Sequence, residues 1–142
     1  MVAGIDVAGP GKDETVCYVR RGNSIVSFAA WSIPDPRGQC VAFLTPYKAR
    51  LRSVKVDSIG IGYNFGLHLQ DQGFAVDLVN VGQAAHNAAR FANAKAEYYW
   101  GLRERFQAGE IASLTDDLTI AQLGTIRWKA TPAGKDRDRR QK

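Results

Sequence analysis

Short apolar runs separated by turn residues dominate the first part of the chain. Residues 2–8 form an apolar run interrupted only by Asp6, and residues 15–20 and 24–31 alternate between apolar and polar positions. Strands joined by connections of only a few residues pair antiparallel. The pattern therefore predicts a three-stranded antiparallel meander.

Helical periodicity then enters the pattern. An apolar stripe predicts a helix over residues 38–51, kinked at Pro46. Strands are predicted over 54–61 and 74–79, with a short helix over 63–72 between them. Because a helix separates these consecutive strands, they must pair in parallel. We expect an α/β fold, a mixed five-stranded sheet of order 3-2-1-4-5 with flanking helices.

The last part of the pattern is helical. Asn93 is expected to cap a helix that runs to residue 108, and Thr115 is expected to cap a shorter one. A final strand is expected to begin over residues 125–129. Four apolar residues at helical spacing predict the buried stripe of the longer helix: Ala94, Tyr98, Leu102 and Phe106.

The composition fits one globular domain. The chain has 142 residues, 45% of them hydrophobic and 23% charged. We assign residues 1–134 to one domain and expect residues 135–142, which are charged and lack hydrophobic side chains, to be a disordered basic tail. The net charge of +5 comes largely from this tail, so charge alone is a weak argument for a polyanionic partner.

Membrane, secretory and zinc-binding classes are not favoured. No charge-free run reaches the roughly 18 residues needed to cross a bilayer, and no secretory signal is visible at the N-terminus. Cys17 and Cys40 are not part of a Cys/His cluster, so we expect buried thiols in a reducing, cytoplasmic setting.

Two acids lie where acids are costly. Asp6 follows Ile5 and Asp57 follows Val56, each inside a predicted buried strand. A buried carboxylate must be paired, hydrogen-bonded or bound to a cation. If the two strands are parallel neighbours, about 4.8 Å apart, their carboxylates converge. Such a pair fits a two-ion Mg²⁺ site, although a lone Asp near a strand end more often caps a turn or pairs with a nearby Arg.

Three segments carry a family resemblance. They are GIDVAGPGKDET at 4–15, VDSIGIGYNFGLHL at 56–69 and FANAKAEYYWGLRERFQAGEI at 91–111. With the strands between them, the chain resembles the C-terminal nuclease domain of phage terminase large subunits over about residues 2–134. The resemblance implies an RNase H-like fold.

The resemblance also implies a function and a set of partners. The family cuts concatemeric viral DNA with Mg²⁺ or Mn²⁺, in the cytoplasm of a bacterial host. By the resemblance, Asp6 and Asp57 are catalytic metal ligands, whereas Asp13 lies near the site without being a ligand. The implied partners are double-stranded DNA, the terminase ATPase domain, the small terminase subunit and the portal. No membrane partner is expected.

The sequence departs from the family pattern in two respects. It contains no Walker A motif, so we expect this chain to lack the ATPase domain that precedes the nuclease in the family. It also lacks the Ser-Pro-Asp motif that supplies the third metal-binding acid, and Asp136 and Asp138 do not match that motif. We therefore expect weak or absent cleavage by this chain. The abrupt change in composition after Lys135 resembles that of a frameshifted or truncated prophage gene.

Lys95 and Arg103 are the candidate DNA-binding residues, on a predicted helix that also carries Tyr99 and Trp100. Two other classes remain open. A resolvase-type RNase H-like nuclease would share the two acids, and an actin-like or sugar-kinase ATPase lobe also opens with a Gly-Ile-Asp strand and a glycine-rich turn.

Overall fold

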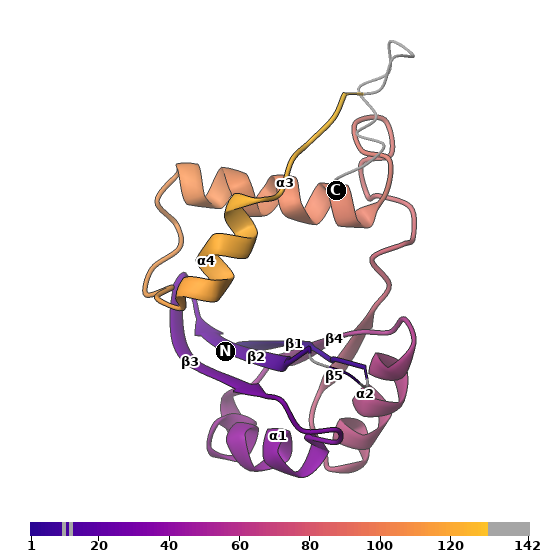
Figure 1. Cartoon of the computed structure of the whole chain (residues 1–142), viewed down its shortest axis with the longest axis vertical. Helices are drawn as coiled ribbons and strands as arrows, with labels where there is room; N and C mark the ends of the chain where they lie inside the picture. Colours follow the sequence, from indigo (N-terminus) through magenta and orange to yellow (C-terminus); the bar gives the residue numbers. More distant parts are fainter. Residues whose placement is uncertain (10, 12, 131–142) are drawn as a thin grey trace. The chain divides into compact units, whose positions relative to one another are not determined.

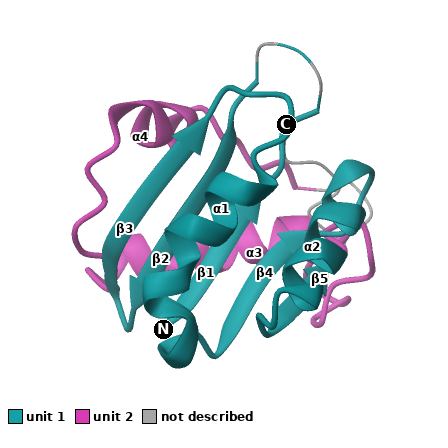
Figure 2. Cartoon of the chain, turned by 90° about the horizontal axis from the view of Figure 1, so that it is seen from below, with its two compact units in different colours: residues 1–79 teal, residues 80–142 magenta. Residues whose placement is uncertain are grey.

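The computed structural model describes residues 1–9, 11 and 13–130. The chain divides into two compact units, unit 1 over Met1–Val79 and unit 2 over Asn80–Lys142 (Figures 1 and 2). Unit 1 contains the sheet, and unit 2 contains the two later helices.

A mixed five-stranded sheet forms the centre of unit 1. Its order is β3-β2-β1-β4-β5, as the sequence predicts. β1 pairs antiparallel with β2, which pairs antiparallel with β3, whereas β4 is parallel to both β1 and β5. The strands are β1 (Val2–Asp6), β2 (Thr15–Arg21), β3 (Ser24–Trp31), β4 (Ser53–Asp57) and β5 (Val76–Val79).

Two helices and a 3₁₀-helix complete unit 1. They are α1 (Arg37–Leu44), η1 (Thr45–Arg50) and α2 (Ile61–Asp71). In Figure 2, α1 and α2 lie on the same side of the sheet. Alternate strand residues point to this side and bury against the helices, which places the hydrophobic core between the two layers. The core includes Ala3, Ile5, Cys17, Val19, Cys40, Leu44, Val54, Val56, Phe65 and Leu69.

The predicted helix over 38–51 is two elements. α1 ends at Leu44, and η1 contains Pro46 within its first two positions. Proline has no N–H to donate and its ring clashes with the preceding turn, so the α-helix cannot continue through it. Leu44 and Leu51 are buried, whereas Lys48 of the same predicted stripe is exposed.

Two helices organise unit 2: α3 (Ala94–Gln107) and α4 (Asp117–Gly124). As predicted, Asn93 caps α3, because its Oδ1 accepts a hydrogen bond from the Ala96 N–H at 2.9 Å. Glu97 in the first turn of α3 accepts from the backbone N–H groups of His86 and Asn87. These bonds fasten the segment before α3 to the helix.

The apolar stripe predicted for α3 is wrong in part. Ala94 is buried, but Tyr98 and Phe106 are 50% and 42% exposed. The buried contacts of this region are made instead by a small cluster of Ala85, Phe91 and Ala96, against which Trp100 packs. The helix therefore uses a different face from the one its periodicity suggested.

Two predictions for the following segment are also wrong. Asp116, not Thr115, caps α4, with its Oδ2 accepting from the Thr119 N–H at 2.8 Å. Residues 125–129 form no strand. After α4 this segment turns, and the Thr125 N–H and hydroxyl both bond to the Gln122 carbonyl. The expected tail, residues 135–142, lies outside the described residues.

Within the described residues, no helix is both long enough and apolar enough to cross a membrane.

Candidate metal centre

Asp6 and Asp57 end two adjacent parallel strands. The register pairs Ile5 with Val56, and both of these side chains are buried in the core. Side chains alternate between the faces of a sheet, so the next residue on each strand points to the opposite face. Asp6 and Asp57 therefore stand side by side on the face that α1 and α2 leave uncovered. The prediction that both carboxylates share one side of the sheet agrees with this register.

The turn after β4 fixes the Asp57 carboxylate. Its Oδ1 accepts a hydrogen bond from the Ile59 N–H at 3.0 Å, an Asx turn that ends the strand. Gly60 follows with a φ of 67°, and α2 begins at Ile61. The predicted strand over 54–61 was therefore too long, and Asp57 lies at the end of the strand, where a side chain reaches solvent more easily.

Gly62 lets α2 start close to this strand end. A Cβ atom at Gly62 would collide with the backbone carbonyl oxygen of Asp57. Only glycine allows that approach. The backbone that carries Asp57 is thus held between its own Asx turn and the first turn of α2.

Negative charge accumulates around Asp6. Partial burial raises the pKa of the Asp6 carboxyl above its ordinary value, and the nearby carboxylates of Asp57 and Asp13 raise it further. The Asp6 side chain is exposed to solvent nevertheless. The Ala8 N–H donates a hydrogen bond to the hydroxyl of the buried Thr15 at 3.0 Å, which links the segment after β1 to the start of β2.

The two carboxylates suit a hard divalent cation. Mg²⁺ takes oxygen ligands, keeps several of its waters and is commonly held by one or two carboxylates plus substrate phosphates. A cation would also offset the mutual repulsion that raises the pKa of Asp6. Among the described residues, no group of three or more His, Cys, Asp or Glu side chains is arranged to hold a metal ion. A cation held by Asp6 and Asp57 would therefore have few protein ligands in this part of the chain.

An ion pair lies on the same face of the sheet, two residues before Asp57 along β4. Lys55 Nζ lies 2.6 Å from Asp77 Oδ2, and the register pairs the two residues across β4 and β5. Lys55 precedes Asp57 by two positions, so both side chains point to one face. Pairing keeps this lysine with Asp77, which leaves the charge at the strand ends predominantly negative.

A small cavity opens beside the strand ends, on the side of the helices. Its volume is about 210 Å³, and its lining includes Val7, just after Asp6, and Ile61, at the start of α2. Arg37 and Asp35 also line it and form an ion pair at 2.8 Å. Hydrogen bonding to Arg37 lowers the pKa of the Asp35 carboxyl. This acid is therefore already partnered.

The candidate DNA-binding residues lie in unit 2. Lys95 and Arg103 are both exposed on α3. The Arg103 guanidinium lies over the Trp100 ring, 4.8 Å from its centroid, a cation–π geometry. Sequence reasoning did not find Trp128, which forms an edge-to-face contact with Trp100 at 5.6 Å. Trp128 lies in an irregular segment after α4, and the strand predicted there gave no sign of this contact.

Comparison with known proteins places the fold. No protein-family model and no curated protein sequence matches the chain. Among solved structures, the nuclease domain of the large terminase subunit gp2 of bacterial virus Sf6 is similar over 96% of this chain and 74% of that one, with a TM-score of 0.77 and 12% identity. A variant of the Sf6 domain with manganese and β-thujaplicinol gives a TM-score of 0.74 at 13% identity, again over 96% of this chain and 74% of that one.

A second phage gives the same result. The large terminase nuclease of thermophilic phage G20c with bound magnesium is similar over 94% of this chain and 68% of that chain, with a TM-score of 0.70 and 17% identity. The predicted RNase H-like fold and the resemblance to terminase nuclease domains are thereby confirmed at the level of structure.

Proposed function

We propose that this chain is a metal-dependent DNA endonuclease domain of a phage DNA-packaging terminase. Its fold is that of the Sf6 and G20c terminase nucleases. The observation that carries the proposal is the matched register of Asp6 and Asp57 at the ends of adjacent parallel strands, which gathers two carboxylates on one face. Double-stranded DNA is the substrate.

Divalent cations are the proposed cofactors, with Mg²⁺ or Mn²⁺ bound by Asp6 and Asp57. Magnesium, cobalt, manganese and calcium all accompany the neighbouring terminase nucleases. Bound at this site, such ions would activate a water molecule and stabilise charge on the phosphate being cut. Asp6 and Asp57 are the residues that would hold these ions.

The chain's own residues prepare this site. The Ile59 N–H orients the Asp57 carboxylate, and Gly62 lets α2 support the same turn. Asp6 keeps one side open to solvent, from which a phosphate can approach. The raised pKa of Asp6 means that cation binding must displace a more tightly held proton, so binding strengthens as pH rises.

Cleavage by this chain should be slow. Two carboxylates supply fewer anionic ligands than a three-acid site, so cation affinity is reduced. The wider packaging role is part of the same proposal: the ATPase domain, the small terminase subunit and the portal are its partners, in the cytoplasm of the bacterial host.

Nicking of supercoiled plasmid in Mn²⁺ tests the proposal. We expect slow nicking that stops in EDTA and is lost in Asp6→Asn and Asp57→Asn. Asp71→Asn, which removes an exposed carboxylate at the end of α2, should nick at the wild-type rate. Nicking that persists in EDTA or in the Asp6→Asn/Asp57→Asn double variant would refute the proposal. Rapid cleavage by the wild type would refute the expected weakness of the site.

A further inference from the structure

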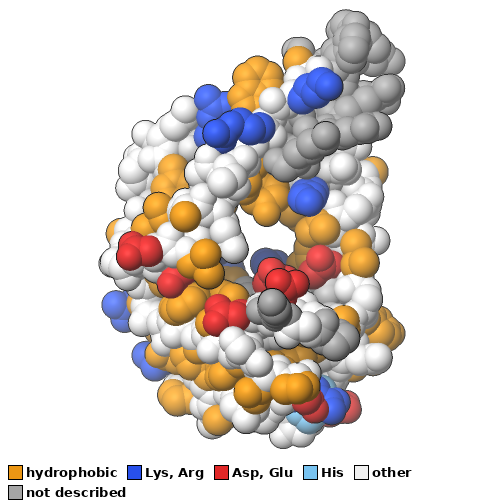
Figure 3. Space-filling model, in the orientation of Figure 1, with side chains coloured by type: hydrophobic (Ala, Val, Ile, Leu, Met, Phe, Trp, Pro, Cys, Tyr) orange, Lys and Arg blue, Asp and Glu red, His pale blue; other side chains and the backbone are white. Residues whose placement is uncertain are grey.

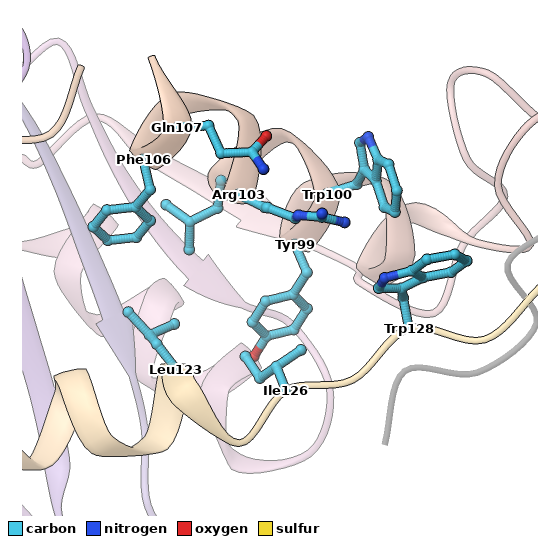
Figure 4. Close-up of a pocket in the computed structure, with 9 residues that line it drawn as sticks. Tyr99, Trp100, Arg103, Phe106, Gln107, Leu123, Ile126 and Trp128 are labelled. Atoms are coloured by element: carbon cyan, nitrogen blue, oxygen red, sulfur yellow. The ribbon is translucent and has the colours of Figure 1, made fainter. Parts of the chain in front are cut away.

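An apolar pocket lies within unit 2, between α3 and the segment that follows α4 (Figure 4). Its volume is about 250 Å³, and nine residues line it. Four of these are aromatic: Tyr99, Trp100, Phe106 and Trp128. The pocket therefore offers flat ring surfaces, in contrast to an aliphatic core cavity.

The Trp100 ring is held in place from several sides. Its Nε1 donates to Glu104 Oε1 at 2.9 Å, and Arg90 and Arg103 lie over the ring at 5.2 and 4.8 Å. Trp128 meets it edge-on, with 85° between the ring planes. The Trp128 side chain is 55% exposed, so much of its indole remains open to solvent. The pocket thus has one fixed ring and one accessible ring.

The charge at the pocket is positive. Arg103 is the one charged residue among the nine that line it. Two more basic residues, Arg127 and Lys129, flank Trp128 in sequence, and both are exposed. Figure 3 shows Lys and Arg side chains over the α3 region and the segment after α4. An anionic ligand with a planar ring complements this combination better than an apolar peptide does.

We propose that this pocket binds an unpaired nucleobase of single-stranded DNA, with the base stacked on Trp128 and its phosphate near Arg103. Aromatic platforms beside cations bind single strands in this way without sequence preference, because every base has a flat face. The inference rests on the proposed nuclease function, since a strand that has been cut or frayed supplies unpaired bases. The site itself requires no metal ion.

Binding of a fluorescein-labelled oligothymidine of about 12 nucleotides, measured by anisotropy in EDTA, tests the inference. Trp128→Ala should weaken binding about 5- to 150-fold, the range for the loss of one stacked base. Arg103→Ala should also weaken it, and Arg103→Lys should restore part of the loss by keeping the charge. Trp31→Phe, at a partly buried indole in unit 1, is the matched control and should bind as the wild type does.

Competition and folding measurements complete the design. Unlabelled oligothymidine should compete better than a duplex of the same length and charge. Circular dichroism melting must show that Trp128→Ala remains folded. If Trp128→Ala does not fold, the loss of binding in Arg103→Ala tests the inference in its place. Trp128→Phe, which keeps a ring, should then retain most of the binding.

Three results would overturn the inference: oligothymidine binding that survives both Trp128→Ala and Arg103→Ala, a preference for duplex, or a pocket closed by self-association in sedimentation runs. Failure of the nuclease proposal is read separately. It appears as metal-independent nicking or as Asp57→Asn without effect, and neither alters a binding assay in EDTA.

Discussion

The Asp6 carboxyl group illustrates how much of the site is decided at single residues. An acid between Ile5 and Val7 signals a costly position, and the sequence identified both Asp6 and Asp57 on that ground. The family resemblance also placed Asp13 near the site, which agrees with its effect on the pKa of Asp6. It did not predict the hydrogen bond between the Ala8 N–H and the buried Thr15 hydroxyl. A bond that closes a turn over seven residues leaves no periodic trace in the chain.

The raised pKa of Asp6 predicts a pH-dependent gain in stability for Asp6→Asn. The folded protein holds the Asp6 proton more tightly than the unfolded chain does. The contribution of this group to stability is therefore fully present below the ordinary pKa of 3.8. It is lost as pH rises through the raised pKa of the folded protein. At pH 7 without divalent cations, Asp6→Asn should raise Tm by on the order of 2 °C, a small effect because the group is exposed.

Thermal melts at pH 7 and below pH 3.5 measure this difference. The gain should vanish at the lower pH, where Asp6 is neutral in both states. Equal Tm values for the two proteins at pH 7 would contradict the electrostatic account of the acid cluster.

The two cysteines should be inert in the folded protein. Cys17 and Cys40 are both fully buried, and the hydrogen bond between their side chains, together with burial, raises the pKa of the Cys17 thiol. A thiol that remains protonated is a poor nucleophile. A disulfide reagent such as DTNB should label neither thiol at pH 8 until denaturant is added, when both react. Immediate labelling of either cysteine in the native protein would show that this core opens readily.

At the scale of elements, the strand pattern was predicted better than the element ends. The meander strands and the parallel pairing followed from alternation and connection length, and the sheet order is the predicted one. The end of β4 was predicted too late, because the apolar run continues through Ile61. Asp57 accepts a hydrogen bond from the Ile59 N–H and turns the chain before that point. The exposed face of α3 was missed because its partners, Ala85 and Phe91, lie in an irregular segment.

Gly62 provides the sharpest test of how β4 and α2 are joined. Gly62→Ala should cost about 3 kcal/mol or more, because the added methyl group collides with backbone and not with a flexible side chain. It should also displace Asp57. Gly101→Ala is the matched control, since a Cβ there meets no neighbouring atom within 4 Å, and alanine in the middle of α3 should stabilise by up to about 1 kcal/mol.

Urea denaturation followed by circular dichroism compares the two variants. Gly62→Ala should lower the free energy of unfolding, and Gly101→Ala should raise it. A Gly62→Ala protein as stable as the wild type would mean that α2 can move away from the end of β4 without cost.

For the whole molecule, the pattern of apolar and polar residues is enough to predict the fold, whereas the surface sites are visible only in the structure. The Sf6 and G20c domains share the fold at 12% and 17% identity, so few particular residues are needed to specify it. The order of strands and crossovers is sufficient to bring Asp6 beside Asp57. The aromatic pocket of unit 2 was not predictable, because Trp128 lies in a segment whose composition suggested a strand.

Direct titration of the protein with Mn²⁺ by calorimetry tests the central claim, that Asp6 and Asp57 form one cation site. The wild type and Asp71→Asn should show saturable binding, and Asp6→Asn and Asp57→Asn should each weaken it at least tenfold, about 1.4 kcal/mol. Absence of saturable binding in the wild type, or binding unchanged by both substitutions, would contradict the claim.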